Sequence, residues 1–296
     1  MVAETINGTQ QALNVPQLAP GQRYELTYPI PTDHRGVYHL GPVTIGQSDP
    51  LRLVWSGSRD DRRDTLHVHP RIHRVAPMPS GLSRDMDGQD ATSAPQGGVA
   101  FHSVREYVSG DSWRLIHWAT SARLGTLMVR HNIVPNESHL VVVLDTSTAP
   151  YSDRTFEEAV STAASLCVAA ARAGYRLDLR TTAHVRARLA GGRAGTDQLP
   201  SLLDACAEVR RGADAGLVPL CQTLPADSGA ALTVVTGRVG ADALGAVAVL
   251  SSRFLVTSLI QLADDLVVPT SLHGVRSVVV GSGGEFAKAW NRLIRT

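Results

Sequence analysis

The sequence predicts a mixed α/β protein, in which a small β-sandwich-like domain precedes a doubly wound α/β domain. Short runs with a period near two, separated by Gly and Pro, fill the first seventy residues. Beyond residue 139, strongly apolar runs alternate with segments whose apolar residues recur every third or fourth position. The chain has 296 residues and 43% hydrophobic content, which is enough to form a sizeable core.

The β-rich domain is expected to span residues 1–76. Its short alternating runs predict strands, and several strands at this spacing are typical of a small sandwich. The candidate strands are 24–28, 37–40, 43–45, 51–54 and 65–69. Residues 77–100 are rich in Pro, Ser, Gly, Asp and Gln, so we expect a solvated linker there.

The α/β domain is expected to span residues 139–296. Leu140–Leu144 is apolar at every position, as a strand buried on both faces must be. Alternation of such runs with helical patterns predicts a mainly parallel sheet covered by helices. The expected strands are 140–144, 177–181, 184–189 at an edge, 232–236, 254–259 and 277–280. The expected helices are 156–173, ended by Gly174, and 199–209, 241–250 and 285–294.

The charge balance argues against nucleic-acid binding and against attraction to anionic membranes. The chain has 28 basic and 27 acidic residues, which gives no strong overall field. Its three cysteines are far apart and form no CxxC pair, which favours a reducing compartment. No apolar run approaches the roughly 18 residues of a membrane span. These observations predict a soluble, cytoplasmic chain.

Between the two domains, residues 101–138 hold the densest polar chemistry. A helix is expected to begin at Asp111 or Ser112 and to run to about Leu124, with Gly125 ending it. The candidate site residues are Arg105, Glu106, Asp111, Arg114, His117, Trp118, Arg123 and Arg130. The guanidinium groups of the four arginines in this set either lock the two domains together through ion pairs or bind an anion or nucleotide.

The same segment resembles the signature of the bacterial DUF58 family. The matching stretches are Arg105-Glu106-Tyr107, Gly110-Asp111, Arg114, Ile116-His117-Trp118, Ser121-Ala122-Arg123, Gly125 and Val129-Arg130. Upstream, the stretches Arg35-Gly36-Val37-Tyr38, Leu40-Gly41-Pro42 and Asp49-Pro50-Leu51 resemble the family's β-rich part.

This resemblance implies a von Willebrand A-like (Rossmann-type) second domain and a MoxR-type AAA+ ATPase as partner. Relatives are often membrane-anchored through two N-terminal helices that are absent from this chain, with this region on the cytoplasmic side. The resemblance therefore implies either a truncated product or a naturally shorter, soluble form.

The loop after the strand 140–144 raises the question of a metal site, because open α/β sheets bind ligands at the carboxyl ends of their strands. In von Willebrand A domains this loop reads Asp-x-Ser-x-Ser and, with a Thr and an Asp from other loops, holds Mg²⁺. Here Asp145 and Ser147 match, Ala149 replaces the second Ser, Thr196 is the candidate Thr, and Arg238 stands near the place of the acid. We expect no cofactor and no tight Mg²⁺ site, and we expect Asp145 to act as a cap or to pair with Arg238.

The remaining motifs indicate no catalytic set. His67, His69 and His73 suggest zinc, but a solvated strand face explains them better because no further ligand of suitable spacing joins them. The Gly-rich stretch 281–284 lacks the Lys of a phosphate-binding loop and is expected to be a plain turn. The sequence therefore predicts a non-enzymatic protein-binding adaptor. Its expected contact face is formed by the loops 145–151, 196–199 and 236–239. An anion or nucleotide receptor is the alternative, and a hydrolase is a third interpretation.

Overall fold

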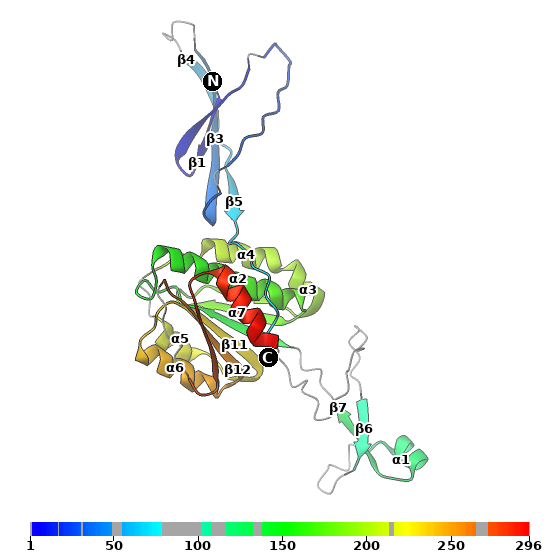
Figure 1. The fold of residues 1–296 in the computed structure, drawn as a ribbon. Coiled ribbons are helices and arrows are strands. Elements are labelled where there is room, and N and C mark those ends of the chain that lie inside the picture. The colour runs from blue at the N-terminus through cyan, green and yellow to red at the C-terminus, as the bar shows by residue number, and fades with distance from the viewer. Residues whose placement is uncertain are drawn as a thin grey trace.

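The computed structural model describes residues 2–16, 18–30, 32–48, 55–78, 102–107, 116–132, 138–212, 216–264 and 272–295. It is a mixed α/β structure with a five-stranded sheet, a six-stranded sheet that carries helices, and a two-stranded ribbon (Figure 1). The coarse fold class predicted from the sequence is therefore confirmed. No helix in these ranges is both long enough and apolar enough to cross a membrane.

The N-terminal sheet is antiparallel throughout, in the order β2-β1-β3-β4, with β5 also paired to β3. The strands are β1 (Val2–Ile6), β2 (Thr9–Leu13), β3 (Gly36–Ser48), β4 (Trp55–Asp60) and β5 (Asp64–Val68). A tight turn at Asn7 and Gly8 joins β1 to β2, with φ angles of 47° and 81°. This Asn-Gly pair is a strong hairpin signal, so the sequence could have predicted both strands.

The expected sandwich is not formed by the residues that the structure describes, which make a single sheet here. Burial in this sheet is confined to a few side chains such as Ala3 and Ile6, whereas Ile45 is 54% exposed. The predicted strand at 24–28 is irregular, and the Tyr28 hydroxyl bonds the Glu4 carboxylate. A short polar run buries little apolar area, so it forms a regular strand only when it pairs with the edge of another strand. The candidate strand 51–54 lies outside the described residues.

The second sheet has the order β10-β9-β8-β11-β12-β13, and only the β10–β9 pair is antiparallel. Its strands are β8 (His139–Leu144), β9 (Arg176–Thr181), β10 (Arg186–Leu189), β11 (Asp227–Thr236), β12 (Phe254–Leu262) and β13 (Val275–Val280). The helices around it are α2 (Asp153–Arg172), α3 (Gly192–Asp197), α4 (Leu199–Glu208), α5 (Leu217–Thr223), α6 (Ala241–Ser251) and α7 (Gly283–Arg295). The short helices α3 and α5 were not predicted.

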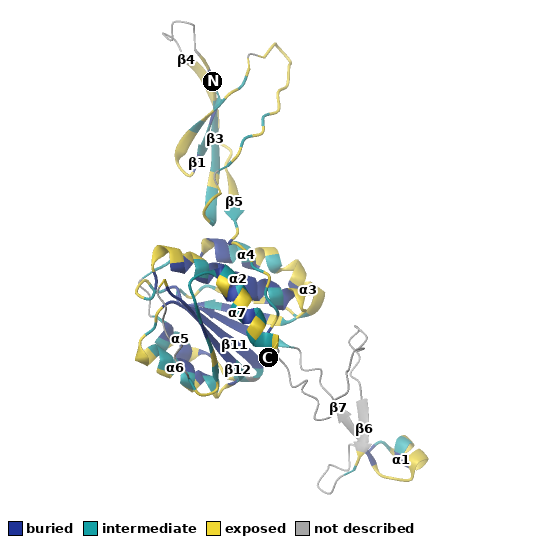
Figure 2. Cartoon of the chain, viewed as in Figure 1, coloured by how far each residue is buried: buried dark blue, intermediate teal, exposed yellow. Residues whose placement is uncertain are grey.

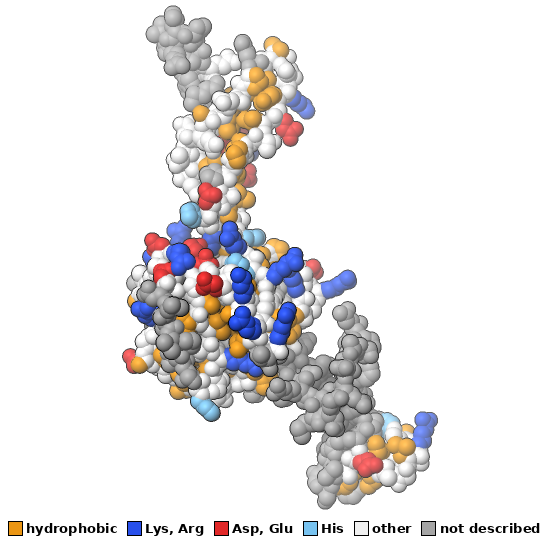
Figure 3. Space-filling model, in the orientation of Figure 1, with side chains coloured by type: hydrophobic (Ala, Val, Ile, Leu, Met, Phe, Trp, Pro, Cys, Tyr) orange, Lys and Arg blue, Asp and Glu red, His pale blue; other side chains and the backbone are white. Residues whose placement is uncertain are grey.

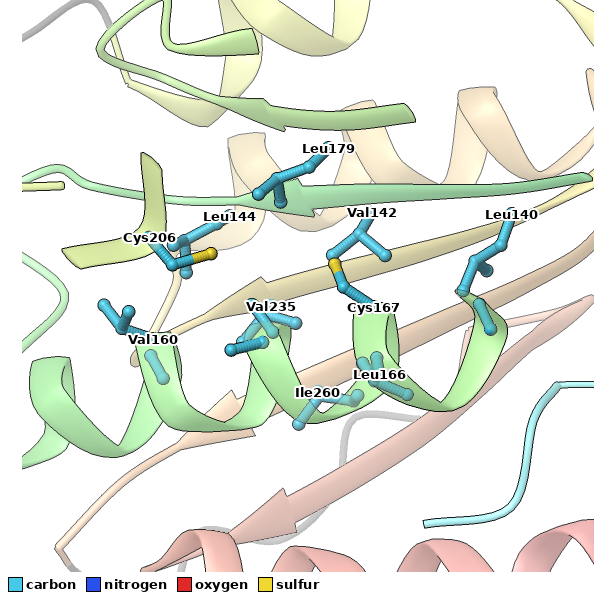
Figure 4. Close-up of a cluster of buried hydrophobic side chains, with 14 of the residues drawn as sticks. Leu140, Val142, Leu144, Val160, Leu166, Cys167, Leu179, Cys206, Val235 and Ile260 are labelled. Atoms are coloured by element: carbon cyan, nitrogen blue, oxygen red, sulfur yellow. The ribbon is translucent and has the colours of Figure 1, made fainter. Parts of the chain in front are cut away.

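Two hydrophobic clusters form the core, one on each face of this sheet (Figure 2). Leu140, Val142 and Leu144 pack on one face, with side chains of α2 and α4 (Figure 4). Side chains of α7 belong to the same cluster. Val141 and Val143 pack on the other face, with side chains of α5 and α6. The continuous apolar run of β8 is thus explained, because both of its faces are covered.

Helix α2 shows why its sequence folds locally as predicted. Ser152 accepts a hydrogen bond from the Thr155 amide, and the Thr155 hydroxyl accepts one from the Ser152 amide, which makes a capping box. The helix ends before Gly174, whose φ of 77° suits glycine. The end was predicted correctly, whereas the start lies three residues before the expected Phe156.

Residues 71–78, here called the strap, belong with the α/β domain rather than with the expected β domain and linker. Their backbone is bonded by the side chains of Ser161 and Ser165 on α2, and of Trp290 and Asn291 on α7. Met78 is fully buried in the core, where its sulfur accepts hydrogen bonds from Thr233 of β11 and Ser258 of β12. The expected boundary at residues 76–77 therefore falls inside a packed segment.

Candidate functional site

Asp145 occupies the carboxyl end of β8, and only 1% of the residue is exposed. Its backbone is fixed from two sides. Its amide donates to the Val235 carbonyl at 2.9 Å, and its own carbonyl accepts from the Tyr151 hydroxyl at 2.8 Å. The carboxylate is thus held at the point where the central strands of the sheet end.

The carboxylate accepts hydrogen bonds from three hydroxyl groups. Its Oδ1 atom accepts from Ser147 Oγ at 2.6 Å and from Thr182 Oγ1 at 3.4 Å, and its Oδ2 atom accepts from Thr236 Oγ1 at 2.8 Å. The Ser147 amide adds a fourth bond to Oδ1 at 3.0 Å. Ser147, Thr182 and Thr236 follow or end β8, β9 and β11, so this Asp145 cluster ties three strand ends together.

Tyr151 completes the support under the loop after β8. Burial, followed by the nearby Asp145 charge, raises the pKa of the Tyr151 phenol well above its usual value. The phenol therefore stays protonated at neutral pH and remains a hydrogen-bond donor to the Asp145 carbonyl. Its ring packs edge-on against Phe156 at a centroid distance of 5.4 Å. Tyr151 thus stabilises the loop and is a poor acid–base group at neutral pH.

Thr196, the threonine expected in a metal site, lies elsewhere. It is exposed on α3, and its hydroxyl donates to the Ala171 carbonyl at the end of α2. The reason is that β10 runs antiparallel to β9 and returns the chain to the amino edge of the sheet. The prediction for Thr196 is therefore wrong, and the threonines beside Asp145 are Thr182 and Thr236.

This set of oxygen donors fits a tight Mg²⁺ site poorly. Mg²⁺ prefers near-octahedral oxygen ligands and is usually held through carboxylates. The Asp145 cluster contains one carboxylate, whose two oxygens already accept hydrogen bonds from hydroxyls. Arg238, near the place of the third-loop acid, is exposed, and its amide donates to the Pro150 carbonyl. Side-chain hydrogen bonds to the carboxylate come from the hydroxyls of Ser147, Thr182 and Thr236, and the expected pairing of Asp145 with Arg238 stays a prediction. Across the described ranges, no three His, Cys, Asp or Glu side chains gather as a metal cluster.

The signature segment forms its own small unit of β6 (His102–Glu106), α1 (Trp118–Leu124) and β7 (Met128–Asn132). His117 caps α1, since its Nδ1 atom accepts from the Thr120 amide at 3.1 Å. The buried Ser121 hydroxyl accepts from the Met128 amide at 2.8 Å and ties the helix to β7. The end at Gly125 is confirmed by its left-handed φ of 72°. The helix does not include His117, whose amide bonds the Met128 carbonyl instead.

The predicted signature residues are only partly described. Glu106 and Arg123 are exposed, and Trp118 is 66% exposed. Arg105 and Arg130 lie in β6 and β7, where they pair with Val129 and Val104. Asp111 and Arg114 lie outside the described residues. The choice between an interdomain network and an anion site in this segment stays a prediction.

Comparison with known proteins identifies the family. A family model described as "Protein of unknown function DUF58" matches residues 103–280, more than half of the chain. The chain belongs to the DUF58 family. "Uncharacterized protein YeaD" from Bacillus subtilis (strain 168) is 28% identical over 143 residues. That match covers 48% of this chain and 35% of the relative, so it spans about a third of YeaD.

Arg35 of this DUF58 chain is a residue for which the sequence suggested no role. Its side chain is 6% exposed, and its guanidinium donates to the carbonyls of Cys206 and Val209, at the end of α4, at 2.8 and 2.7 Å. It also pairs with Glu157 at 2.8 Å and lies over the Phe156 ring. Its presence in the upstream stretch that resembles DUF58 proteins was the available signal. Arg35 joins the N-terminal sheet to the α/β domain.

Two histidines of β5 meet the same helix. His67 Nε2 lies 3.4 Å from a Glu208 carboxylate oxygen, and His69 Nε2 lies 2.8 Å from an Asp204 oxygen. Figure 3 shows acidic, basic and histidine side chains mixed where this DUF58 chain's N-terminal sheet meets the helices. His73 lies on the strap, away from this pair. The histidines thus pair individually with α4 carboxylates, rather than facing only solvent as expected.

Proposed function

We propose that this DUF58 protein is a non-enzymatic, protein-binding adaptor and that its second domain is von Willebrand A-like. Strand order and direction support the fold assignment. Numbered along the domain, the strands lie in the order 3-2-1-4-5-6, with helices on both faces and only the third strand antiparallel. The retained Asp145 and Ser147 of the first loop agree with it.

The observation that carries the adaptor proposal is the Asp145 cluster. One buried carboxylate bonds groups at the ends of three strands, so the loops above them are held in one arrangement. A surface that is already ordered loses little conformational entropy when a partner binds. We call this surface the rim, formed by residues 145–151, 182–185 and 236–239. The expected loop 196–199 lies at the opposite edge and is not part of it.

The environment of the Asp145 carboxylate favours binding over catalysis. A general base must present a free oxygen to its substrate. Here both carboxylate oxygens accept hydrogen bonds from neighbouring hydroxyls, and the residue is 1% exposed. Asp145 therefore organises the rim, and exposed groups such as Arg238 lie on its surface.

The proposed partner is a MoxR-type AAA+ ATPase, and resemblance to the family is its support. Charged groups at the rim would set orientation and specificity more than affinity. They include Arg238 in the rim and, beside it, the ion pair between Arg211 and Asp153, whose carboxylate is 94% exposed. The protein would present a client to the ATPase through this surface.

The experiment titrates the purified chain with a MoxR-type ATPase from the same genome, with biolayer interferometry as readout. Arg238→Glu is expected to weaken binding roughly tenfold or more, because it reverses a charge at the rim. Arg253→Glu makes the same change at an exposed position before β12, at the opposite edge of the sheet, and should bind like the wild type. Circular dichroism verifies that both variants fold.

Failure of the wild-type chain to bind would remove the ATPase as partner. Equal effects of the two variants would show that the rim is not the contact surface. Turnover of a small molecule that is lost in Asp145→Asn would contradict the non-enzymatic assignment.

A further inference from the structure

A second candidate site lies at the amino edge of the large sheet, opposite the rim. It is a cavity of about 170 Å³, near the first residues of β8, β9 and β11. Its polar lining consists of His139, Arg176, Asp178, Arg180, Arg188 and Asp227. Apolar side chains, among them Val141 and Phe254, complete the wall. We call it the amino-edge cavity.

The alternation of β9 explains why charged groups gather here. Leu177 and Leu179 enter the core beneath α2 and α4, so the intervening Asp178 and Arg180 belong to the other face. Register places Arg188 of β10 opposite Asp178 and Arg186 opposite Arg180. The core on that face is built from β8, β11 and β12 with α5 and α6, and the charged groups of β9 and β10 lie beside it.

Three guanidinium groups surround one carboxylate, that of Asp178, at the amino-edge cavity. The Asp178 side chain is 8% exposed and accepts from Arg180 at 2.9 Å and from Arg186 at 3.1 Å. Arg188 lies 3.6 Å from the same carboxylate. The second carboxylate of the cavity, Asp227, already bonds His139 Nδ1 at 2.8 Å.

The cluster therefore holds more positive than negative charge in a partly desolvated place. The Arg180 side chain is 14% exposed, and guanidinium groups that crowd around one carboxylate repel each other more strongly there than in water. Arg176, at the start of β9, adds a further cation to the lining. An anion between these groups would relieve the repulsion.

We propose that the amino-edge cavity binds a small phosphate-type oxyanion, either inorganic phosphate or the phosphate group of a small metabolite. Guanidinium groups match the geometry of phosphate oxygens and bind them with charge-assisted hydrogen bonds. Arg180 gives two of its five donors to Asp178, and Arg188 lies near the same carboxylate with a side chain that is 62% exposed. The cavity is smaller than the roughly 300 Å³ at which pockets for drug-sized ligands begin, which suits a small anion.

This inference concerns the edge opposite the proposed docking rim and goes beyond the adaptor function. Arg188→Gln should leave ATPase binding unchanged, and Arg238→Glu should leave phosphate binding unchanged. Failure of one proposal is thus distinguishable from failure of the other.

Isothermal titration with inorganic phosphate at low ionic strength tests the proposal, with pyrophosphate and succinate as separate probes. The wild type is expected to bind phosphate, and Arg188→Gln roughly tenfold more weakly, because one charge-assisted contact is lost. Arg295→Gln is the matched control, since Arg295 is exposed at the end of α7 in the layer on the other face. It should bind phosphate like the wild type.

Thermal unfolding supplies a second readout that does not depend on heats of binding. Phosphate should raise the Tm of the wild type and of Arg295→Gln, because a ligand that binds the folded state stabilises it. It should raise the Tm of Arg188→Gln far less. In phosphate-free buffer, Arg188→Gln should be as stable as the wild type, since it removes one of the crowded cations.

Three results would overturn the proposal. The first is a wild type that shows neither heat nor a Tm increase with phosphate or pyrophosphate. The second is equal phosphate affinity in the wild type and Arg188→Gln. The third is binding of succinate without binding of phosphate, which would assign the cavity to carboxylates.

Discussion

Replacing Arg35 by alanine is expected to destabilise the protein and to loosen the N-terminal sheet from the α/β domain. Arg35 precedes β3, yet its guanidinium caps the last turn of α4 by donating to the carbonyls of Cys206, Ala207 and Val209. The last carbonyls of a helix have no partner within the helix, so they depend on such a donor. Alanine would leave these carbonyls in a buried place without it.

The expected loss of unfolding free energy in Arg35→Ala is estimated from each contact of Arg35 in turn. Glu157 is 47% exposed, so its ion pair with Arg35 contributes at most about 1 kcal/mol. A buried acceptor left without a donor costs about 1–3 kcal/mol, and neighbouring acceptors do not add fully. Loss of the stacking on Phe156 contributes a smaller amount. Together these effects predict a loss of roughly 3–5 kcal/mol, as for other cases in which one partner is removed from a buried charge network.

The assay is urea unfolding, followed by tryptophan fluorescence, to which the buried Trp290 of the α/β core contributes, and by limited proteolysis between the domains. Arg35→Lys should lie between the wild type and Arg35→Ala, because one ammonium group cannot bond Glu157 and the carbonyls together. Arg62→Ala is the control: Arg62 is 89% exposed beside Asp60, and its loss should change the free energy of unfolding by less than about 0.5 kcal/mol. Equal free energies of unfolding for Arg35→Ala and Arg62→Ala would refute the assignment of Arg35 as the interdomain anchor.

The cysteines and two glycines give further expectations. Burial raises the pKa of Cys206 and of Cys221 to about 12 and that of Cys167 well above its usual value, so a thiol reagent at pH 8 should label none of them before unfolding and all three afterwards. Because these pKa values exceed those of the unfolded chain, near 9, the stability that the protonated thiols contribute is complete below pH 9. It should fall as the pH rises towards 12, as measured by urea unfolding in a pH series. Gly237→Ala would bring its Cβ into a clash with the Pro150 carbonyl oxygen in the loop after β8, so calorimetry should show a loss of about 1–3 kcal/mol. Gly245→Ala, in open space on α6, should instead gain up to about 1 kcal/mol.

The α/β domain was largely predictable because its core dictates its pattern. Leu140–Leu144 is buried on both faces, which leaves a run of apolar residues that few other structures require. The face of α2 that carries Val160 and Cys167 is buried against it, so the helical period is equally clear. The helices α3 and α5 were missed because six or seven residues contain too few turns to show a period.

The N-terminal part was harder to predict because local pattern says little about pairing. The long strand β3 was read as two short strands, since Gly41 and Pro42 interrupt the alternation at the point where its partner changes from β5 to β4. The run 24–28 alternates apolar and polar residues as a strand does, but within the described residues it pairs with no other strand. Whether such a run pairs depends on tertiary contacts, which the local pattern does not show. The strap was read as the end of the β domain and the start of a linker, because its bonds come from helices more than eighty residues away.

The sequence predicted part of the Asp145 cluster but not all of it. Asp145 and Ser147 follow directly from a buried strand, so their position at its carboxyl end could be inferred from the sequence. Thr182 and Thr236 join them only because β9 and β11 both lie next to β8. The spacing of residues along the sequence does not predict this strand order. The choice of Thr196 failed for the same reason, since the reversal of β10 moves that residue to the other edge.

The two edges of the large sheet use charge in opposite ways, and this contrast decides which edge suits which ligand. At the carboxyl edge, the Asp145 carboxylate accepts hydrogen bonds from the neutral hydroxyls of Ser147, Thr182 and Thr236. Both of its oxygens therefore have partners within the fold. At the amino edge, one carboxylate at Asp178 faces several guanidinium groups, so positive charge remains for something outside the fold. The proposed protein partner would dock on the rim through exposed groups such as Arg238 without disturbing the Asp145 cluster. At the rim a small oxyanion would meet no group of crowded cations, whereas at the amino edge it would lower the repulsion between them directly.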